Sequence, residues 1–297
     1  MKRVLITGAN GLLGQKLITE LIEDYELLAT ARAPQPVLQS PTFLYRRLDI
    51  ENYRACKAVI EDFRPEVIIN AAAYTNVDGC EVEREACWRA NVKGVENLVR
   101  AARNRMIQII HISTDYIFDG TNGPYAEEQR PNPLCYYGKA KLASENVIKA
   151  AGLPYTIVRT SVVYGVGVAV KSNFFLWVYQ RLQQDKPIRV VTDQYNTPTW
   201  VDDLAGGIHL ILNRPFLGVI HISGPDFIDR YRMAVQIAQT FHFDPSRIIP
   251  ITTDQLQQRA SRPLKAGLKI EKAVQELGFR PKTLKESFEF LKASLSK

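Results

Sequence analysis

The 297-residue sequence contains few of the residues that define disulfide-rich or metal-binding proteins. It has four cysteines without any C-x-x-C spacing: Cys56, Cys80, Cys87 and Cys135. Four are too few for a disulfide scaffold in a chain of this size, so we expect reduced and mostly buried thiols. Four histidines are far apart and form no H-E-x-x-H motif: His111, His209, His221 and His242. The sequence therefore predicts no metal site.

Long hydrophobic runs are also missing. The longest, such as Val67–Ile69, are far shorter than the ~20 apolar residues that cross a bilayer, so we expect no membrane segment. Met1-Lys2-Arg3 precedes the apolar Val4–Ile6, but Thr7–Gly11 interrupts that stretch too early for a signal peptide. We therefore expect a cytoplasmic protein.

Clusters of basic residues are absent as well. The formal net charge of +7 comes from lysines and arginines that are spread along the chain, with no run longer than a pair such as Arg46-Arg47. This distribution does not favour a nucleic-acid partner. It fits an anionic small substrate or cofactor, and equally a solvated surface. No G-x-S-x-G elbow supports nucleophilic hydrolysis.

Short apolar runs alternate with longer amphipathic segments through the first two-thirds of the chain, which is typical of βα units that feed a parallel sheet. The predicted strands are 3–7, 26–31, 43–48, 67–71, 108–113, 155–159 and 219–222. The predicted helices between them are 12–24, 53–63, 83–105, 137–151, 173–184 and 202–213. Apolar residues at helical spacing in 83–105 predict one long helix with Trp88 in the core.

The last third of the chain changes character. Segments 230–241, 254–259, 272–277 and 284–295 are predicted as helices with proline-containing connections and little strand signal. We therefore predict two domains. Residues 1–165, completed by about 200–225, form a dinucleotide-binding domain, and 166–199 with 226–297 form a smaller, mostly helical substrate lobe.

Three glycines at a spacing of three follow the first predicted strand: Gly8, Gly11 and Gly14. Glycine permits the tight turn, lets the backbone approach a pyrophosphate and lets the helix pack close to the sheet. The N-terminus of that helix would face the anion. Such glycines also occur as simple turn residues, so the pattern gains weight from its place between a strand and a helix.

Residues after the next strands extend this predicted cofactor site. Arg32 follows the second strand, where an acidic residue would bind the ribose of NAD, so its guanidinium favours the 2′-phosphate of NADP. A surface arginine at a strand end is the alternative. Asp49 is placed to reach an adenine amino group, and Ala71–Ala73 offer small side chains where the backbone passes a ligand.

A phenol and an ammonium, on Tyr137 and Lys141, are four residues apart at the start of a predicted helix and so share one face. A cation close to a phenol favours the phenolate and lowers the pKa of the phenol, which helps proton donation near neutral pH. The hydroxyl of Thr114, at the end of the fifth strand, can bind the same carbonyl oxygen that Tyr137 protonates.

With these residues the sequence resembles the extended short-chain dehydrogenase/reductase family, and within it the dTDP-4-dehydrorhamnose reductases. The resemblance covers nearly the whole chain. The stretches that carry it are 69–78 (INAAAYTNVD), 112–120 (ISTDYIFDG), 137–143 (YGKAKLA), 193–199 (DQYNTPT) and Arg262-Pro263. It implies a Rossmann-like, doubly wound α/β fold with a parallel sheet, and NADPH as cofactor with NADH as second candidate.

The resemblance also implies roles for residues. Tyr137 is the general acid, Lys141 holds the nicotinamide ribose and lowers the pKa of Tyr137, and Thr114 binds the C4 carbonyl. The cofactor residues would be Gly8, Asn10, Gly11, Leu12, Leu13, Gly14, Arg32, Asp49, Ile50, Ala71, Ala72, Ala73, Tyr74, Asn91, Tyr137 and Lys141. The sugar would lie near Val77, Asp78, Thr114, Asp115, Tyr116 and Tyr137.

The implied reaction is reduction of the 4-keto group of a nucleotide-linked 6-deoxy sugar. The resemblance is also compatible with a homodimer. Val162 stands where such reductases usually carry tryptophan, so the resemblance does not identify the sugar. One alternative is a 4-epimerase or a 4,6-dehydratase, although Asp115 is followed by Tyr116 where a dehydratase has its glutamate base. Another is a non-catalytic NADP-binding regulatory subunit similar to the β subunit of methionine adenosyltransferase.

Overall fold

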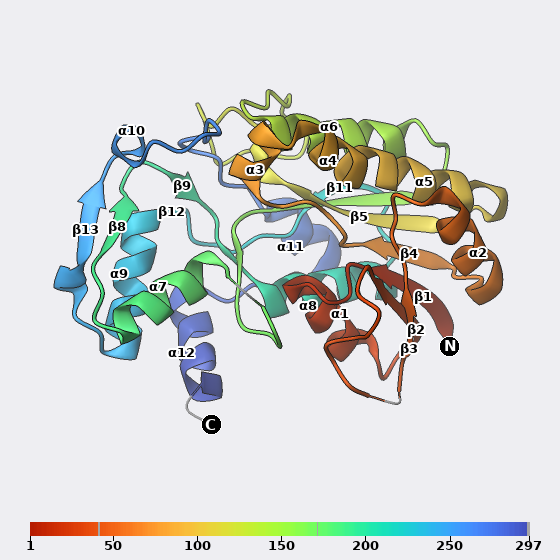
Figure 1. Ribbon diagram of the computed structural model, residues 1–297, viewed down its shortest axis with the longest axis horizontal. Helices are drawn as coiled ribbons and strands as arrows, with labels where there is room; N and C mark the ends of the chain where they lie inside the picture. The colour runs from red at the N-terminus through yellow and green to blue at the C-terminus, as the bar shows by residue number, and fades with distance from the viewer. Residues whose placement is uncertain (41, 171, 296–297) are drawn as a thin grey trace.

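The computed structural model describes residues 1–40, 42–170 and 172–295, and its larger body is built around a seven-stranded sheet (Figure 1). All the strand pairs in this sheet are parallel. The strand order is β11-β6-β5-β4-β1-β2-β3. The strands are β1 (Lys2–Thr7), β2 (Tyr25–Ala31), β3 (Leu44–Arg47), β4 (Val67–Asn70), β5 (Gln108–Thr114), β6 (Tyr155–Thr160) and β11 (Gly218–His221). The predicted α/β class and parallel sheet are confirmed.

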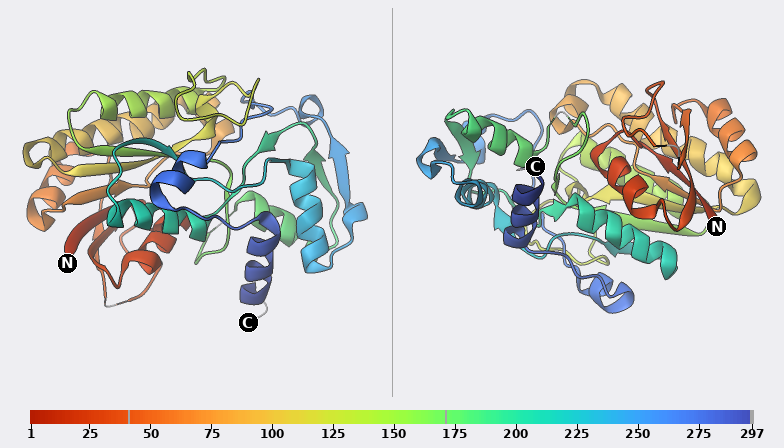
Figure 2. Two further views of the ribbon diagram at one scale, coloured as in Figure 1. Left: turned by 180° about the vertical axis from the view of Figure 1, so that it is seen from behind. Right: turned by 90° about the horizontal axis from the view of Figure 1, so that it is seen from below.

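Helices cover both faces of this sheet (Figure 2). On one face, α1 (Leu12–Leu21), α8 (Val201–Asn213) and α11 (Glu271–Leu277) close one hydrophobic core. On the other face, α2 (Tyr53–Phe63), α5 (Gly94–Ala102) and α6 (Tyr136–Lys149) close a second core. Because both faces are covered, the central strand β4 is buried along its whole length, which explains its uninterrupted apolar run.

The order of the strands reverses between β1 and β4: β2 and β3 lie on one side of β1, and β4, β5, β6 and β11 lie on the other. The glycine turn after β1 lies here. Gly8 has φ +70°, and a Cβ on it would lie 2.7 Å from the backbone carbon of Ala71 at the end of β4. Only glycine allows the two backbone segments to approach so closely at this positive φ. The turn can then pass over the strand ends without a side chain that would block a ligand.

The predicted long helix over 83–105 is divided in the structure. It consists of α4 (Arg84–Trp88), a π-helical turn (Arg89–Lys93), α5 and a 3-10 turn (Arg103–Arg105). The prediction of one regular helix was wrong, because hydrophobic spacing alone does not reveal an inserted residue. Trp88 is half-buried rather than fully in the core.

A smaller body packs beside the sheet and has its own core (Figure 1). Its helices are α7 (Phe174–Gln183), α9 (Arg230–Phe241) and α12 (Leu284–Leu295). The predicted helices 230–241 and 284–295 coincide with α9 and α12, and the last third of the chain contains little strand structure, as predicted. The strands β8 (Ile188–Val191) and β13 (Ile248–Ile251) pair in parallel, although Pro250 in the middle of β13 is typical of a loop. The division into two domains stays a prediction, which the separate core supports.

Short elements complete the described part of the chain. The two-residue strands are β7 (Val163–Tyr164) paired with β10 (Thr199–Trp200), and β9 (Tyr195–Asn196) paired with β12 (Ile228–Asp229). The remaining helical elements are α3 (Val77–Val82), α10 (Thr253–Leu256) and 3-10 turns at Asp115–Ile117 and Pro245–Arg247. All four cysteines are free and buried, as predicted. Among the described residues, none of the helices is long and apolar enough to cross a membrane.

Replacing Gly14 by alanine should destabilise the protein, because a Cβ there would lie 2.6 Å from the Cα of Ala9 inside the tight turn. We expect a loss of about 1–3 kcal/mol in the free energy of unfolding. Gly206→Ala on α8 is the matched control. Its Cβ meets nothing within 4 Å, so a helix-favouring alanine should raise stability by about 0.5–1 kcal/mol. Urea unfolding of both variants measures the difference, and equal effects would contradict the steric argument.

Candidate active site

Three adjoining cavities lie along the carboxyl ends of β1, β2, β4 and β5. The outer cavity, of about 490 Å³, lies over β2 and β4. The central cavity, of about 470 Å³, shares Gly8, Gly11, Ala71 and Ala73 with it. The lobe cavity, of about 670 Å³, lies between the sheet and the smaller body and shares Tyr116 and other residues with the central one.

Most of the predicted cofactor residues line these cavities. Those on the outer cavity are Gly8, Asn10, Gly11, Arg32, Asp49, Ile50, Ala71, Ala72, Ala73 and Tyr74. Those on the central cavity include Gly8, Gly11, Leu12, Leu13, Gly14, Tyr137 and Lys141. The outer cavity also contains residues that the sequence did not single out, such as Glu51 and Arg89, which pair with each other. No motif marks these two residues.

Asn91 was predicted beside the cofactor, but it does not line either cavity. It lies in the π-helical turn, is 1% exposed and binds both backbone groups of Tyr74. Its Oδ1 accepts from the Tyr74 N–H at 2.8 Å, and its Nδ2 donates to the Tyr74 carbonyl at 3.0 Å. Asn91 therefore holds the loop that follows β4 in place.

Asp78 was predicted near the sugar, and it too lies outside the three cavities. Its carboxylate accepts a hydrogen bond from the Ala260 N–H at 2.9 Å and pairs with Arg262 at 3.0 Å. These bonds tie α3 to the loop that follows α10. The other predicted sugar residues do line the central cavity: Val77, Thr114, Asp115, Tyr116 and Tyr137.

Thr114, Tyr137 and Lys141 come together on the central cavity. Thr114 ends β5, and the other two begin α6, so the packing of α6 on β5 sets their relation. Tyr137 is 9% exposed, and Tyr116 packs edge-on against its ring at 5.8 Å. The three side chains can therefore act on one bound group.

The pKa of Tyr137 differs from the sequence-based expectation. Burial of its hydroxyl raises the pKa, and the interaction with Thr114 lowers it only in part. The charge of Asp115 raises the pKa further, while the ammonium of Lys141 donates to the Ile112 carbonyl of β5. The expected lowering is therefore wrong for the protein without ligands. A raised pKa keeps Tyr137 protonated at neutral pH, as a proton donor must be.

Lys141 is held by a chain of buried polar groups. Its Nζ donates to the carbonyl of Ile112 at 2.6 Å and lies 3.0 Å from Nε2 of His111. Burial lowers the pKa of Lys141 to about 8. Burial and the nearby Lys141 charge also lower the pKa of His111, so this imidazole stays neutral. Asn70 contacts the other ring nitrogen at 3.0 Å and receives a hydrogen bond from Thr7.

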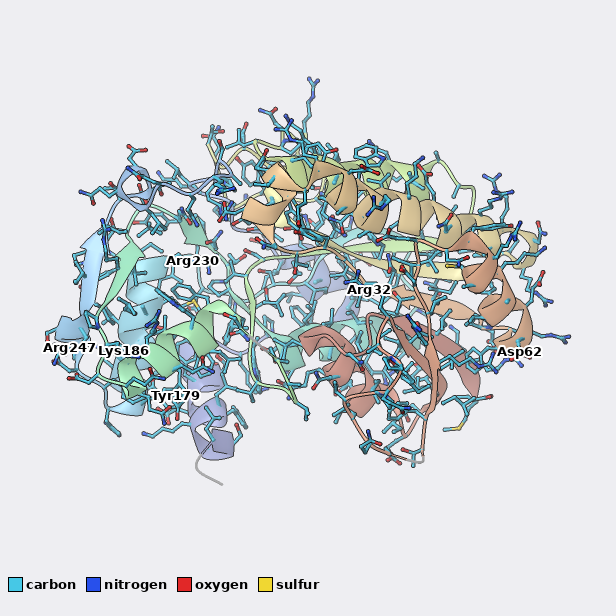
Figure 3. The ribbon with its side chains drawn as sticks, viewed as in Figure 1. Arg32, Asp62, Tyr179, Lys186, Arg230 and Arg247 are labelled. Atoms are coloured by element: carbon cyan, nitrogen blue, oxygen red, sulfur yellow. The ribbon has the colours of Figure 1, made fainter. Side chains whose placement is uncertain are left out.

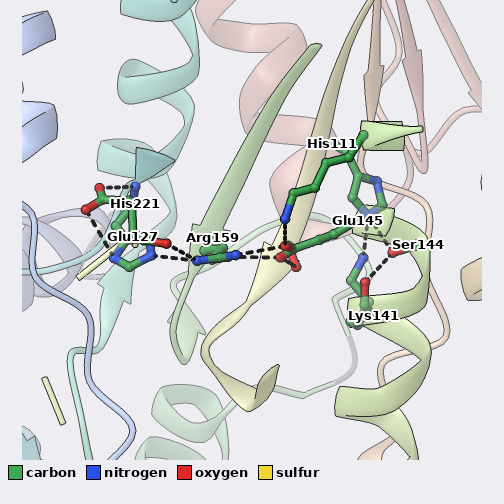
Figure 4. A network of polar contacts seen from close by, with 9 residues as sticks. His111, Glu127, Lys141, Ser144, Glu145, Arg159 and His221 are labelled. Carbon is green, nitrogen blue, oxygen red and sulfur yellow. Dashed lines mark hydrogen bonds and ion pairs between the residues drawn. The ribbon is translucent and has the colours of Figure 1, made fainter. Parts of the chain in front are cut away.

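A buried ion pair fixes α6 one helical turn further along (Figure 4). Glu145 accepts hydrogen bonds from Arg159 at 2.9 and 3.0 Å and from Ser113 at 2.7 Å. Burial opposes ionisation of Glu145, but these bonds outweigh it and its pKa is lowered. The pair links α6 to β5 and β6, and so holds Tyr137 and Lys141 in position.

The lobe cavity is rich in arginine. Arg189, Arg230 and Arg262 line it together with the aromatic side chains of Phe174 and Trp177. The guanidinium of Arg230, labelled in Figure 3, lies 4.8 Å from the centre of the Phe174 ring. Only Arg262 belonged to a recognised stretch of the sequence, because Arg189 and Arg230 lie in segments without a motif.

Comparison with known proteins agrees with this geometry. The model of the RmlD substrate binding domain family matches residues 1–295. A dTDP-4-dehydrorhamnose reductase of Aggregatibacter actinomycetemcomitans is 33% identical, with 99% of each chain covered. Methionine adenosyltransferase 2 subunit beta of Bos taurus is 32% identical over 95% of this chain and 84% of that protein.

A solved structure extends the similarity to three dimensions. The dTDP-4-dehydrorhamnose reductase of Bacillus anthracis, in complex with NADP, has a TM-score of 0.89 and 30% sequence identity. The match covers 99% of this chain and 100% of that one. The predicted resemblance to these reductases is thereby confirmed.

Arg32→Ala should weaken binding of NADPH more than binding of NADH. Arg32 lies exposed at the rim of the outer cavity, where a 2′-phosphate would meet it (Figure 3). Loss of a charge-assisted contact should weaken NADPH about 10- to 100-fold. Arg46→Ala is the control, since Arg46 pairs with Asp62 and lies outside the cavity. Fluorescence titration measures both cofactors, and equal losses would remove Arg32 from the site.

Proposed function

Since this chain belongs to the RmlD substrate binding domain family, we propose that it is an NADPH-dependent reductase of a nucleotide-linked 4-keto-6-deoxy sugar. The most favoured substrate is dTDP-4-dehydrorhamnose, which would give dTDP-L-rhamnose. One observation carries the proposal: Thr114, Tyr137 and Lys141 line the same cavity as the glycine turn. A proton donor, a carbonyl-binding hydroxyl and a cofactor cradle are thus adjacent.

The residues present fit a dinucleotide. Close backbone packing at Gly8 and Gly14 holds the glycine turn in place, and the outer and central cavities together follow this turn. When bound, NADPH supplies a hydride to the substrate carbonyl carbon. Gly11 and the N-terminus of α1 would meet the pyrophosphate. Arg32 would meet the 2′-phosphate, and Lys141 would hold the nicotinamide ribose.

The chain's own groups would handle the carbonyl oxygen. The hydroxyl of Thr114 donates a hydrogen bond to it, which stabilises the negative charge that develops as the carbonyl carbon is reduced. Tyr137 then transfers its phenolic proton to the same oxygen and completes the alcohol. The ammonium of Lys141, held by Ile112 and His111, would bind the nicotinamide ribose, and its positive charge would favour the resulting phenolate.

The lobe cavity supports a nucleotide as the carrier of the sugar. Its three arginines offer positive charge for a diphosphate, and Phe174 and Trp177 offer flat apolar surfaces for a base. Arg230 lines both this cavity and the central one, so it lies between the carbonyl site and the nucleotide site. A sugar diphosphate that extends from the carbonyl site to the nucleotide site would contact Arg230.

Two observations weigh against a dehydratase and against a regulatory subunit. Among the described residues of the central and lobe cavities, Asp115 is the only carboxylic acid, so a dehydratase would lack its second carboxylate. A regulatory subunit needs neither a proton donor nor a carbonyl-binding hydroxyl, yet Tyr137 and Thr114 lie together on the central cavity. The presence of these side chains favours turnover.

Tyr137→Phe should lower kcat about 100-fold or more, because the general acid is lost while the ring still packs on Tyr116. NADPH oxidation, followed by absorbance with a panel of dTDP-, GDP- and CDP-linked 4-keto sugars, measures it. Binding of NADPH should change little.

Tyr179→Phe is the matched control, since Tyr179 lies on α7 in the aromatic cluster with Phe241 and outside the three cavities (Figure 3). Its turnover should equal that of the unaltered protein. Near-normal turnover of Tyr137→Phe would refute the role of Tyr137. Tight NADPH binding without turnover of any sugar in the panel would favour the regulatory function instead.

A further inference from the structure

Asp115 lines the central cavity beside Thr114, and the proposed reaction gives its carboxyl group no proton to transfer. It begins the 3-10 turn after β5 and is 1% exposed. Both of its carboxyl oxygens have partners within the protein. Oδ2 accepts from Ser161 Oγ at 2.6 Å and from Asn196 Nδ2 at 3.4 Å, while Oδ1 lies 3.2 Å from Thr114 Oγ1.

The hydroxyl of Thr114 has a single proton and two lone pairs. One lone pair accepts the N–H of Tyr116 at 3.2 Å. When Asp115 is a carboxylate, the Thr114 proton is donated to its Oδ1 and is not available to a bound ligand. When Asp115 is a carboxylic acid, Oδ1 can donate to the second lone pair of Thr114. The Thr114 proton is then released toward the cavity.

We propose that Asp115 is a positioning residue that acts through Thr114: only as a neutral acid does it let the Thr114 hydroxyl donate to the substrate carbonyl. The proposal rests on the proposed reductase function, because it needs a carbonyl at this place. It assigns the proton on Asp115 no transfer to substrate, so the step still takes its proton from Tyr137. Asp115 sets the direction of one hydrogen bond.

The surroundings of Asp115 stabilise its neutral form relative to a carboxyl in water. Burial raises its pKa to about 6, although Ser161, Thr114 and the charge of Arg230 on α9 act in the opposite direction. Tyr116 and Tyr137 also face this region. Arg262 lies nearby over the Tyr116 ring. Filling the cavity with ligands excludes water and raises the pKa further.

Because burial raises the pKa of Asp115, kcat should depend on pH. Below the pKa of Asp115 the neutral acid is populated and Thr114 donates to the carbonyl. As the pH rises through that pKa, the carboxylate captures the Thr114 proton and kcat falls. Above the midpoint, kcat should fall toward the level of a protein that lacks the Thr114 hydrogen bond.

Asp115→Asn tests the proposal, because the amide imitates the neutral acid. Its Oδ1 can accept from Ser161 and Asn196, and its Nδ2 can donate to Thr114. We expect kcat of this variant to lose the alkaline fall that Asp115 causes, so that it exceeds kcat of the unaltered protein above the pKa of Asp115. A separate fall near pH 8, as Lys141 loses its ammonium, should remain in both proteins. A variant with the same fall near the pKa of Asp115, or with kcat lowered at every pH, would overturn the proposal.

Two further variants separate this effect from a structural one. Thr114→Val removes the hydroxyl, so the fall that Asp115 causes should vanish at a lower kcat, and adding Asp115→Asn should change kcat no further. An additive second loss would contradict action through Thr114. Asp203→Asn is the control, since Asp203 on α8 also has a pKa raised by burial but binds Lys282. Its pH profile should match that of the unaltered protein.

A measurement without substrate distinguishes failure of this proposal from failure of the proposed function. Carbon-13 NMR of the Asp115 carboxyl in the ligand-free protein should show a titration midpoint near 6. Thr114→Val should raise the midpoint, because the carboxylate loses a donated hydrogen bond. No shift in that variant would overturn the Thr114 link. Absence of sugar turnover with the shift intact would refute only the reductase function.

Discussion

The contact between α6 and β5 contains charged side chains that are buried away from water. Lys141 and Glu145 lie one helical turn apart on α6, and both are almost completely buried. An unpaired buried charge would cost about 3–5 kcal/mol, so each must find a partner on the sheet. Lys141 meets the Ile112 carbonyl, and Glu145 meets Arg159. These pairings allow one register of helix on strand.

That register places the reactive groups. Tyr137 lies one turn before Lys141, and Thr114 follows the strand residues to which Lys141 and Glu145 bind. The same desolvation that demands the ion pairs also acts on the cavity. It raises the pKa of Tyr137 and Asp115 and lowers that of Lys141. Desolvation therefore keeps the phenol of Tyr137 protonated and also stabilises the neutral form of the Asp115 carboxyl.

The opposite side of the cavity depends on close backbone packing instead. Gly8 and Gly14 have no side chains because the Ala71 backbone and the turn itself occupy that space. Asn91 then orders the following loop through Tyr74. The cofactor side is thus shaped by backbone approach, and the sugar side by charged side chains of the smaller body, such as Arg230. The two sides meet at Thr114 and Tyr137.

The parallel sheet, the glycine turn and the pair of Tyr137 and Lys141 could be predicted from the sequence. These are local patterns, because strand and helix periodicity, tight-turn chemistry and a spacing of four residues act over a few neighbouring positions. The sequence also predicted Arg32 at the outer cavity, since the end of the second strand is a position defined by the fold.

The long-range partners of each side chain depend on how the elements pack, and no sequence pattern predicted them. Arg230 reaches the cavity from a helix more than a hundred residues after Thr114, and no local pattern announces it. Asn91 and Asp78 bind backbone and a distant arginine rather than ligands. The pKa of Tyr137 likewise depends on burial, which is a property of the packed molecule. Sequence spacing can place two groups on one face, but it cannot give the dielectric around them.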